Sequence, residues 1–482
     1  MTNAESVTQP LSTFEVIVQK CVENNTLGMS LDVRRMDVPE IDSTEWEEAV
    51  QSMQALEAGA IANPDEGRQV GHYWLRDPSI APSDKAREIK ASWTALEDLQ
   101  KVLSDGYSTL LMIGIGGSAL GPQLLVEALH SPEKHVCFLD NTDPEGMDRV
   151  LGALPLSDTL VAVLSKSGGT KETRNAMLEA RAAFSRAGVS FTERAIAVTV
   201  AGSQLDRLAT EEKWLAVLPL WSWVGGRTSI TGMVGLLPLA FVGKDWRRFL
   251  RGANIMDRWT RDLSSDNPAL LMAHGWYGAG DGCGAKDLVV LPYKDSLGLI
   301  GRYLQQLIME SVGKRLDLSN QVVHQGLTVY GNKGSTDQHA FVQQLRDGPN
   351  DFFVNFIAVL RDRDGESLEV EPGVTSGDYL LGFLMGTRNA LTQVGKSSMS
   401  VILDRLSELE LGALIALYER AVGLYAFKIN INAYHQPGVE AGKKAAGDIL
   451  QLQRQVMTGV EVPETDDTWL LRRSLRINGR LA

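Results

Sequence analysis

Short β-rich apolar runs alternate with helical segments over most of the chain, and this alternation limits the possible folds more than any other feature. The run STLLMIGIGG is followed by the helical segment SALGPQLLVEALH, and TLVAVLS is followed by TKETRNAMLEARAAFSRAG. Further β-rich runs, DLVVLPY, LTVYG and FFVNFIAVL, occur later in the chain. Because strands separated by helices pair in parallel, the pattern predicts an α/β fold with doubly wound parallel sheets.

A polar, amphipathic stretch interrupts the alternation, so we expect two α/β domains with helical additions. The predicted segments are an N-terminal, mostly helical segment (1–99), a first α/β domain (100–243), a connector helix (244–264), a second α/β domain (265–430) and a C-terminal arm (431–482). The second domain is expected to end in a long helix from Leu403 to about Phe427. Ligands of open α/β sheets bind beyond the carboxyl ends of the strands, so the loops that follow the strands are the predicted site.

The composition excludes several classes of function. The chain has 482 residues, of which 44% are hydrophobic, and a net charge of −13. A nucleic-acid surface needs a basic stripe, so no nucleic-acid partner is expected. The longest apolar run is too short for a membrane span, and the N-terminus lacks the basic start of a signal peptide. We therefore expect a cytoplasmic protein without a membrane partner.

The cysteines and histidines give no sign of a metal site. Cys21, Cys137 and Cys283 are widely scattered, and neither C-x-x-C nor H-x-x-x-H occurs. No bound metal is therefore expected. The three cysteines are expected to be buried free thiols of a protein in a reducing compartment.

The first strand-end loop, MIGIGGSALGP, is rich in glycine. Gly117 and Ser118 lie where the strand gives way to a helix, and the free N–H groups of a helix start attract anions. Two other interpretations stay open on this segment alone. The glycines also fit the dinucleotide fingerprint G-x-G-x-x-A, with Asp140 at the end of the next strand as a ribose-binding acid. A tight turn without any ligand would have the same sequence.

The next strand-end loop, LSKSGGTKET, favours a phosphate ligand. It offers the hydroxyls of Ser165, Ser167 and Thr170, with Lys166 beside them, at the start of a helix. Hydroxyls, backbone N–H groups and a helix dipole together form a compact cradle for a phosphate monoester. A dinucleotide would not require this second cradle. Thr170 is also expected to cap the helix that follows.

The stretch LIGRYLQQLIMESVGKRLDL brings a carboxylate to the edge of a buried surface. Its apolar stripe at helical spacing consists of Ile300, Tyr303, Leu304, Leu307 and Ile308. Glu310 lies on the shoulder of that stripe, one turn after Gln306 on the same side. A solvated boundary glutamate would explain this position. The alternative is a general base, because a helix end and partial burial both favour the neutral acid and so strengthen the base.

Arg227, His339 and a C-terminal segment are further candidates, each with a simpler alternative. Arg227 follows two glycines in an apolar region, where a guanidinium either pairs with a carboxylate or binds an anion. His339 is expected in the first turn of a helix begun by the preceding Ser-Thr pair, which favours the neutral imidazole. A lone helical histidine is more often structural. The segment YHQPGVEAGKKAA contains Gln436 and Lys443, and taken alone it would be a loop leading into a surface helix.

Taken together, six stretches resemble the motifs of the glucose-6-phosphate isomerase (phosphoglucose isomerase) family, in the order of that family. They are GIGGSALGP, SKSGGTKET, GGRTSITGMVG, QQLIMESVGK, GSTDQHAF and QPGVEAGK. The resemblance runs from about Gly114 to Lys443, which is most of the chain. It implies two sugar-isomerase (SIS) domains with parallel sheets, N-terminal helices and a C-terminal helical arm. It also implies the reversible isomerisation of glucose 6-phosphate and fructose 6-phosphate through an enediolate, in glycolysis and gluconeogenesis.

The resemblance further implies roles for individual residues. Glu310 would move a proton between C1 and C2 of the open-chain sugar, and Arg227 would stabilise the enediolate. His339 and Lys443 would help to open the sugar ring. The substrate-binding residues that it implies are Gly117, Ser118, Ser165, Lys166, Ser167, Thr170, Gln306 and Gln436. No cofactor is implied. A homodimer is implied, because in this family the histidine segment reaches the active site of the partner subunit.

The chain departs from the family motifs at several positions. Ser167, Gly168 and Gly169 replace a Thr-aromatic-Thr run, which removes one hydroxyl from the phosphate loop. Val312 replaces an asparagine of the glutamate motif. No acid, base or charge-stabilising group is lost. Three alternative functions stay open, which are a non-catalytic sugar-phosphate regulator, a nicotinamide-dependent oxidoreductase and a dual phosphoglucose/phosphomannose isomerase.

Overall fold

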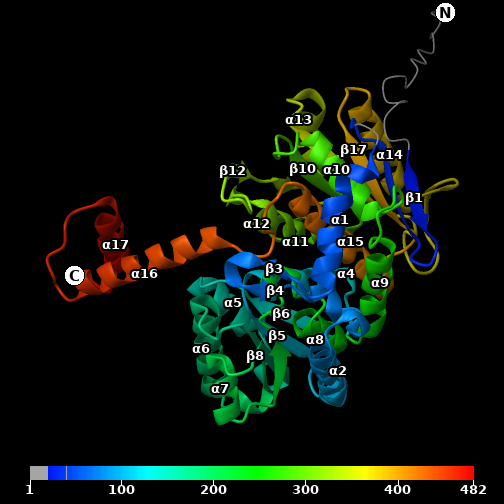
Figure 1. The fold of residues 1–482 in the computed structure, drawn as a ribbon. Coiled ribbons are helices and arrows are strands. Elements are labelled where there is room, and N and C mark those ends of the chain that lie inside the picture. Colours follow the sequence, from blue (N-terminus) through cyan, green and yellow to red (C-terminus); the bar gives the residue numbers. More distant parts are fainter. Residues whose placement is uncertain (1–19, 39–40, 482) are drawn as a thin grey trace, which may run out of the picture. The chain divides into compact units, whose positions relative to one another are not determined.

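The computed structural model describes residues 20–38 and 41–481. The chain forms two units, Met1–Tyr434 and His435–Ala482, and each is described by itself. The first unit holds two large sheets with helices around them (Figure 1). Within the described part of the chain, no helix combines the length and the apolar character that crossing a bilayer requires.

The first sheet is wholly parallel, as the alternation of strands and helices predicts. Its strands, in spatial order, are β6 (His135–Leu139), β5 (Thr109–Ile113), β7 (Thr159–Leu164), β8 (Ala195–Val200) and β9 (Ala216–Leu220). Successive side chains of a strand point to opposite faces, so Leu111 enters one core and Leu110 the other. The central strands are apolar throughout because neither of their faces meets water.

Helices cover both faces of the first sheet, so the domain is doubly wound. One face carries α5 (Pro144–Ala153), α6 (Lys171–Arg186) and α7 (Gln204–Glu211). The other face carries α2 (Ser83–Asp98), α3 (Gln100–Asp105), α4 (Leu120–Ala128) and α8 (Met233–Phe241). In Figure 1, α6 and α7 lie to the left of this sheet, and α2 and α8 lie to its right.

The second sheet is mixed. Its strands, in spatial order, are β1 (Cys21–Asn24), β2 (Met29–Arg35), β17 (Ser398–Leu403), β14 (Phe352–Val359), β10 (Asp287–Tyr293) and β13 (Val329–Tyr330). The last four are mutually parallel, whereas β2 pairs antiparallel with β17. The expectation of a mostly helical N-terminal segment is therefore wrong for residues 21–35. Met29, Leu31 and Val33 alternate into the core, and the hairpin covers the edge of β17.

Helices cover both faces of the second sheet as well. One face carries α13 (Val342–Asp347) and α14 (Ser376–Thr392), and the other carries α10 (Pro268–Ala279), α11 (Ile300–Leu304) and α15 (Glu408–Lys428). The expected start of the long helix at Leu403 is wrong. Leu403 ends β17, and α15 begins after Ser407, whose hydroxyl accepts the N–H of Leu409.

The predicted connector forms α9 (Trp246–Trp259), which packs along α15. A side chain at Gly252 would overlap the carbonyl oxygen of Leu409, and one at Gly412 would overlap that of Phe249. The two helix backbones therefore approach each other closely at these glycines. The apolar face of α9 joins the core that also holds one face of each sheet.

Shorter elements complete the first unit. They are α1 (Glu47–Glu57) and the strand pairs β3 (Ile61–Asn63) with β4 (Arg68–Gln69), β11 (Lys314–Leu316) with β12 (Val322–Gln325), and β15 (Glu369–Glu371) with β16 (Val374–Thr375). The C-terminal unit contains α16 (Pro437–Met457) and α17 (Asp466–Ile477). Thr465 and Thr468 cap α17 reciprocally.

The four boundaries between the five segments expected from the sequence stay predictions.

Candidate active site

The topology of the first sheet predicts one ligand crevice, between two of its strand-end loops. In the strand order, β5 is followed along the chain by β6, its neighbour toward one edge of the sheet. The strand β7 is followed by β8, its neighbour toward the opposite edge. The carboxyl ends of β5 and β7 therefore form the switch point at which open α/β sheets bind ligands. Residues 114–118, with the 3-10 turn η5 (Gly116–Ser118), follow β5, and residues 165–170 follow β7. The predicted phosphate loop thus lies where the topology favours a ligand.

The helices that begin at this crevice differ from their neighbours in how their N-termini are capped. Asp143 and Ser203 cap α5 and α7 through side-chain oxygens. In contrast, α4 and α6 begin without a side-chain cap, and Thr170 stands at the N-cap of α6 without a side-chain bond to it. The expected capping by Thr170 is therefore wrong. The first turn of α6 keeps backbone donors for another acceptor, and a phosphate suits such a helix end.

Two serine hydroxyls and one glycine fold the loop of residues 165–170. Ser165 accepts the N–H of Gly168 at 3.0 Å, and Ser167 accepts the N–H of Gly169 at 3.1 Å. Gly168 has a φ of 72°, and a side chain there would overlap the backbone nitrogen of Leu205. Only glycine fits this position without strain. The contact of both serines with a phosphate stays a prediction.

Lys166 ties this loop to the segment that precedes Arg227. Its ammonium donates to the backbone carbonyls of Ser222 and Val224, at 2.9 Å each. Burial, followed by repulsion from Arg68, lowers the pKa of Lys166 to about 8. Lys166 therefore holds two site loops together. Its role in phosphate binding stays a prediction.

Arg227 is bound by acceptors along its whole guanidinium. Nε donates to Oγ of Ser311 at 2.8 Å, and Nη1 lies 3.1 Å from Oε2 of Glu310. Nη2 donates to the backbone carbonyl of Ala433. Arg227 is only 5% exposed, and burial lowers its pKa while the carboxylate of Glu310 opposes that shift. Of the two alternatives for Arg227, the structure contains the pairing with a carboxylate.

Glu310 follows a change in the winding of its helix. Here α11 continues into a π-helical turn (Gln305–Met309), and α12 (Glu310–Val312) follows. The expectation of one regular helix is therefore wrong over these residues. A π-turn holds about one extra residue and is frequent at functional sites. The Glu310 side chain is 24% exposed and faces a buried cation, which a solvated boundary glutamate would not do.

The glycine loop meets both Gln306 and the turn that carries Arg227. A Cβ atom on Gly116 would lie 3.2 Å from Nε2 of Gln306, and one on Gly117 would overlap the carbonyl oxygen of Gly226. Gly226 begins the 3-10 turn η8 (Gly226–Thr228) that holds Arg227. Gly117 and its half-buried neighbour Ser118 thus lie beside the Glu310–Arg227 pair.

Sequence reasoning missed two residues that support the pair, Ser311 and Lys314, and a third, Arg68, whose charge acts on Arg227 without bonding to it. Ser311 accepts from Arg227, and Lys314 donates to the backbone carbonyls of Glu310 and Ser311, at 2.7 Å each. Arg68 donates to the carbonyl of Tyr434 at 2.9 Å. Lys314 carried a usable signal, because a lysine just after a helix end often bonds the last carbonyls. Ser311 and Arg68 carried none, since only the folded chain brings them to Arg227.

Within the described residues, no hydrogen bond or ion pair joins His339 to Glu310. His339 is exposed and ends the 3-10 turn η11 (Asp337–His339), which begins with the buried Asp337 and starts after Thr336 as expected. The turn then stops before α13, so the expectation of a continuous helix is wrong. Figure 1 shows α13 at the top of the view, at the far end of the second domain from the first sheet. The role of His339 stays a prediction.

The last two candidates belong to the C-terminal unit. Gln436 is the N-cap residue of α16, and Lys443 lies within that helix. The side chain of Lys443 lies outside the described residues. The roles of Gln436 and Lys443 therefore stay predictions.

Comparison of the whole chain with known proteins leads to the same family as these motifs. The sequence profile described as phosphoglucose isomerase matches residues 41–392 and 384–466. The chain belongs to the phosphoglucose isomerase family. A glucose-6-phosphate isomerase of Citrifermentans bemidjiense is 53% identical over 490 aligned residues, which span 94% of this chain and 92% of that protein. One from Geobacter sulfurreducens is 56% identical over 450 residues, 89% and 85% of the two chains.

A relative of known structure shares the fold of this protein. The crystal structure of a glucose-6-phosphate isomerase from Chlamydia trachomatis has a TM-score of 0.85 at 29% identity. The match covers 97% of this chain and 94% of that one. Asp140, the acid of the dinucleotide alternative, accepts a hydrogen bond from Gln123 at 2.8 Å. Family membership and this pairing together argue against a nicotinamide site in the glycine loop.

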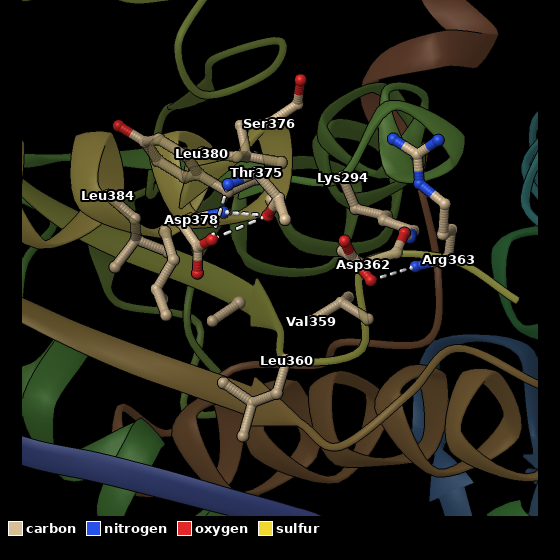
Figure 2. Close-up of a pocket in the computed structure, with 14 residues that line it drawn as sticks. Lys294, Val359, Leu360, Asp362, Arg363, Thr375, Ser376, Asp378, Leu380 and Leu384 are labelled. Atoms are coloured by element: carbon tan, nitrogen blue, oxygen red, sulfur yellow. Dashed lines mark hydrogen bonds between the residues drawn. The ribbon is translucent and has the colours of Figure 1, made fainter. Parts of the chain in front are cut away.

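The second sheet also has a crevice, at the carboxyl ends of β10 and β14. It holds a cavity of about 420 Å³ beside the start of α14 (Figure 2). Thr375 and Asp378 cap α14 reciprocally, and Lys294 donates to the carbonyl of Asp362 at 2.6 Å. None of the predicted site residues lines this cavity. With its helix start already capped, this crevice lacks the feature that favours phosphate in the first sheet.

Proposed function

We propose that the protein interconverts glucose 6-phosphate and fructose 6-phosphate, in glycolysis and gluconeogenesis. The observation that carries the proposal is the pair of Glu310 and Arg227, which lies next to the glycine loop of the first crevice. Aldose–ketose isomerisation needs a base for a carbon acid, a cation where negative charge develops, and an anchor for the phosphate. A protein that only binds sugar phosphates would need the anchor but not the base.

The proposed anchor is the loop of residues 165–170 with the uncapped start of α6. Ser165, Ser167, Thr170 and the backbone N–H groups would bind the phosphate oxygens, with Lys166 adding positive charge. The two carbonyl bonds of Lys166 and the fixed shape of Gly168 support a rigid cradle. Anchoring the phosphate would hold C1 and C2 of the open-chain sugar at a constant distance from it, near Glu310.

The proposed chemistry is a proton transfer at the Glu310 carboxylate. The carboxylate would take the proton from C2 of open-chain glucose 6-phosphate and return it to C1, while a hydroxyl proton moves from O2 to O1. Hydrogen moves within one molecule, so no external oxidant or reductant is needed. Negative charge would grow on oxygen in the enediolate, and the buried guanidinium of Arg227 would stabilise it strongly because water is excluded there. Gln306 would line the same site.

Ring opening and assembly are the finer parts of the proposal. His339 and Lys443 would assist ring opening, and Gln436 would line the site. His339 is exposed and makes no bond to the Glu310 of its own subunit, which supports a homodimer in which it serves the partner's site. Apolar side chains exposed on the nearby α14, Leu381, Phe383 and Met385, support an interface there.

A cytoplasmic location is also part of the proposal. The three cysteines are free thiols, which suits a reducing compartment. The expectation that all of them are buried is wrong, because Cys283 is exposed and Cys21 and Cys137 are half-buried.

A coupled assay tests the proposal. Purified protein receives fructose 6-phosphate, and glucose 6-phosphate is measured through its NADP-dependent oxidation by an added dehydrogenase. Rapid formation of glucose 6-phosphate is expected. Binding of fructose 6-phosphate without conversion would instead indicate a regulator. A parallel assay with mannose 6-phosphate separates a strict isomerase from a dual one, because only the latter converts mannose 6-phosphate at a comparable rate.

A further inference from the structure

Lys314 is a buried lysine at the end of the helix that carries Glu310. It is 5% exposed, and its Nζ donates to the backbone carbonyls of Glu310 and Ser311, at 2.7 Å each. The last carbonyls of a helix have no partner within the helix, and a cation there also suits the negative end of the dipole. Lys314 therefore fixes the backbone of these two residues.

Both residues that Lys314 holds also hold Arg227. Ser311 accepts from Nε of Arg227 through its hydroxyl, at 2.8 Å, and Glu310 pairs with Nη1 at 3.1 Å. One side of Ser311 thus faces Lys314 and the other faces Arg227. A shift of this short turn would change both contacts of the guanidinium at once. The π-helical turn immediately before Glu310 leaves α12 only three residues long. Its position therefore depends more on hydrogen bonds from other elements than that of a longer helix would.

We infer that Lys314 is a positioning residue for the isomerisation, because it fixes the turn that aligns Glu310 and Ser311 with Arg227. This inference rests on the proposed roles of Glu310 as base and Arg227 as charge stabiliser. Lys314 acts through the backbone of other residues and has no assigned contact with the substrate.

The charges around Lys314 come from three elements. Arg227 in η8 repels the ammonium, whereas Glu310 in α12 and Asp65 in the 3-10 turn η2 (Pro64–Glu66) attract it. Burial, ahead of these effects, lowers the pKa of Lys314 to about 7. A neutral amine keeps two N–H donors, so both bonds to the carbonyls survive loss of the proton. Positioning therefore persists on either side of neutral pH.

Lys396 supplies a matched control. It is 4% exposed and donates to the carbonyls of Gly348 and Pro349, at 3.0 and 2.8 Å, away from the proposed site. Lys314→Met and Lys396→Met therefore lose the same kind of buried bonds. Both variants are expected to unfold at lower urea concentration than the wild type, since each leaves two buried carbonyls without a donor.

Steady-state kinetics with fructose 6-phosphate test the inference. In Lys314→Met, kcat is expected to fall by about 10²-fold, because a small misplacement of a catalytic group has effects of this size. KM, and the affinity for glucitol 6-phosphate, which has the phosphate but no carbonyl, should change by less than about threefold. Lys396→Met should change none of these.

Conservative variants decide the outcome if Lys314→Met is insoluble. Lys314→Arg keeps a long side chain with several N–H donors and should recover most of kcat. Lys314→Gln should not, because its side chain is shorter and its planar amide cannot take the place of Nζ between the two carbonyls. A kcat of Lys314→Met or Lys314→Gln within about threefold of Lys396→Met would overturn the inference. Failure of the proposed function is distinguishable, because then the wild type would be inactive or Glu310→Gln would stay active.

Discussion

The carboxylate of Glu310 lies 3.1 Å from the guanidinium of Arg227, although the two residues follow strands of different sheets. Arg227 comes after β9 of the first sheet, and Glu310 comes after β10 of the second. The pair exists only because one core, made of helices and one face of each sheet, joins the two sheets. If Glu310 is the base and Arg227 the charge stabiliser, catalysis depends on that packing.

Replacing the proposed base tests the assignment directly. Glu310→Gln should lower kcat by at least about 10²-fold, because an amide cannot take a proton from carbon. Affinity for glucitol 6-phosphate, followed by calorimetry, should stay close to that of the wild type. Glu97→Gln, which removes a carboxylate from an exposed pair with Arg247, is the control and should keep full activity. Near-wild-type turnover in Glu310→Gln would exclude it as the base.

Arg227→Lys tests whether the geometry of the guanidinium matters or only its charge. A lysine cannot meet Ser311, Glu310 and the carbonyl of Ala433 at once, because it lacks the planar fork. We expect kcat/KM to fall by about 10²- to 10³-fold, the range seen when a group that stabilises an oxyanion is lost. The coupled assay gives the value. A fall of less than about fivefold would mean that charge alone suffices.

Gly168→Ala tests the phosphate loop. Alanine at a φ of 72° is strained, and its Cβ would overlap the backbone of Leu205, so the loop must move. KM for fructose 6-phosphate should rise by about tenfold, with a smaller change in kcat, because the anchor contributes to binding. Gly188→Ala is the matched control, since its φ is 68° but open space surrounds it. It should cost about 1 kcal/mol of stability without changing KM.

The free energy of unfolding should depend on pH in a way that reflects the lowered pKa of Lys314. Its pKa is about 7 in the folded protein and returns toward 10.5 on unfolding. Between these values the unfolded chain binds more protons, so this lysine makes the free energy of unfolding rise with pH. The advantage of the wild type over Lys314→Met should therefore widen as pH increases through that window. Urea titrations at several pH values measure it, and a constant difference would contradict the prediction.

Mixed dimers test whether two subunits share a site. Glu310→Gln and His339→Ala should each be nearly inactive as homodimers. If His339 serves the partner's site, a heterodimer of the two variants contains one site with both native residues. Random mixing should then restore about a quarter of the wild-type rate, since half the dimers are mixed and each has one intact site. No recovery after unfolding and refolding the mixture would mean that each subunit uses its own His339.

The sequence was sufficient for the architecture because parallel strands buried on both faces must be apolar throughout. STLLMIGIGG and TLVAVLS show that pattern, and both form central strands of the first sheet. The glycine and hydroxyl residues after these strands also lie at the predicted crevice. The order of the strands within each sheet follows less directly from the sequence than their existence does. The hairpin β1–β2 was missed because its short strands, separated by one turn, lack the long apolar runs of the parallel strands.

Local details of the site were missed for a different reason. Thr170 has the right identity for a helix cap, yet its side chain makes no bond to α6. The apolar stripe before Glu310 suits a regular helix, yet the chain forms a π-helical turn there. Such choices are small energy differences that neighbouring elements decide, so local propensity does not reveal them.

The sequence by itself determined the two α/β units, the loops that follow their strands, and the residue types needed to handle a phosphorylated sugar. These properties depend on periodicity and on chemistry that each short segment carries alone. Only the tertiary structure decided that Arg227 faces Glu310, that Ser311 and Lys314 hold them, and that Lys166 ties two loops together. The physical reason is that buried charges and backbone carbonyls must find partners, and those partners come from distant segments that only the packed chain brings together.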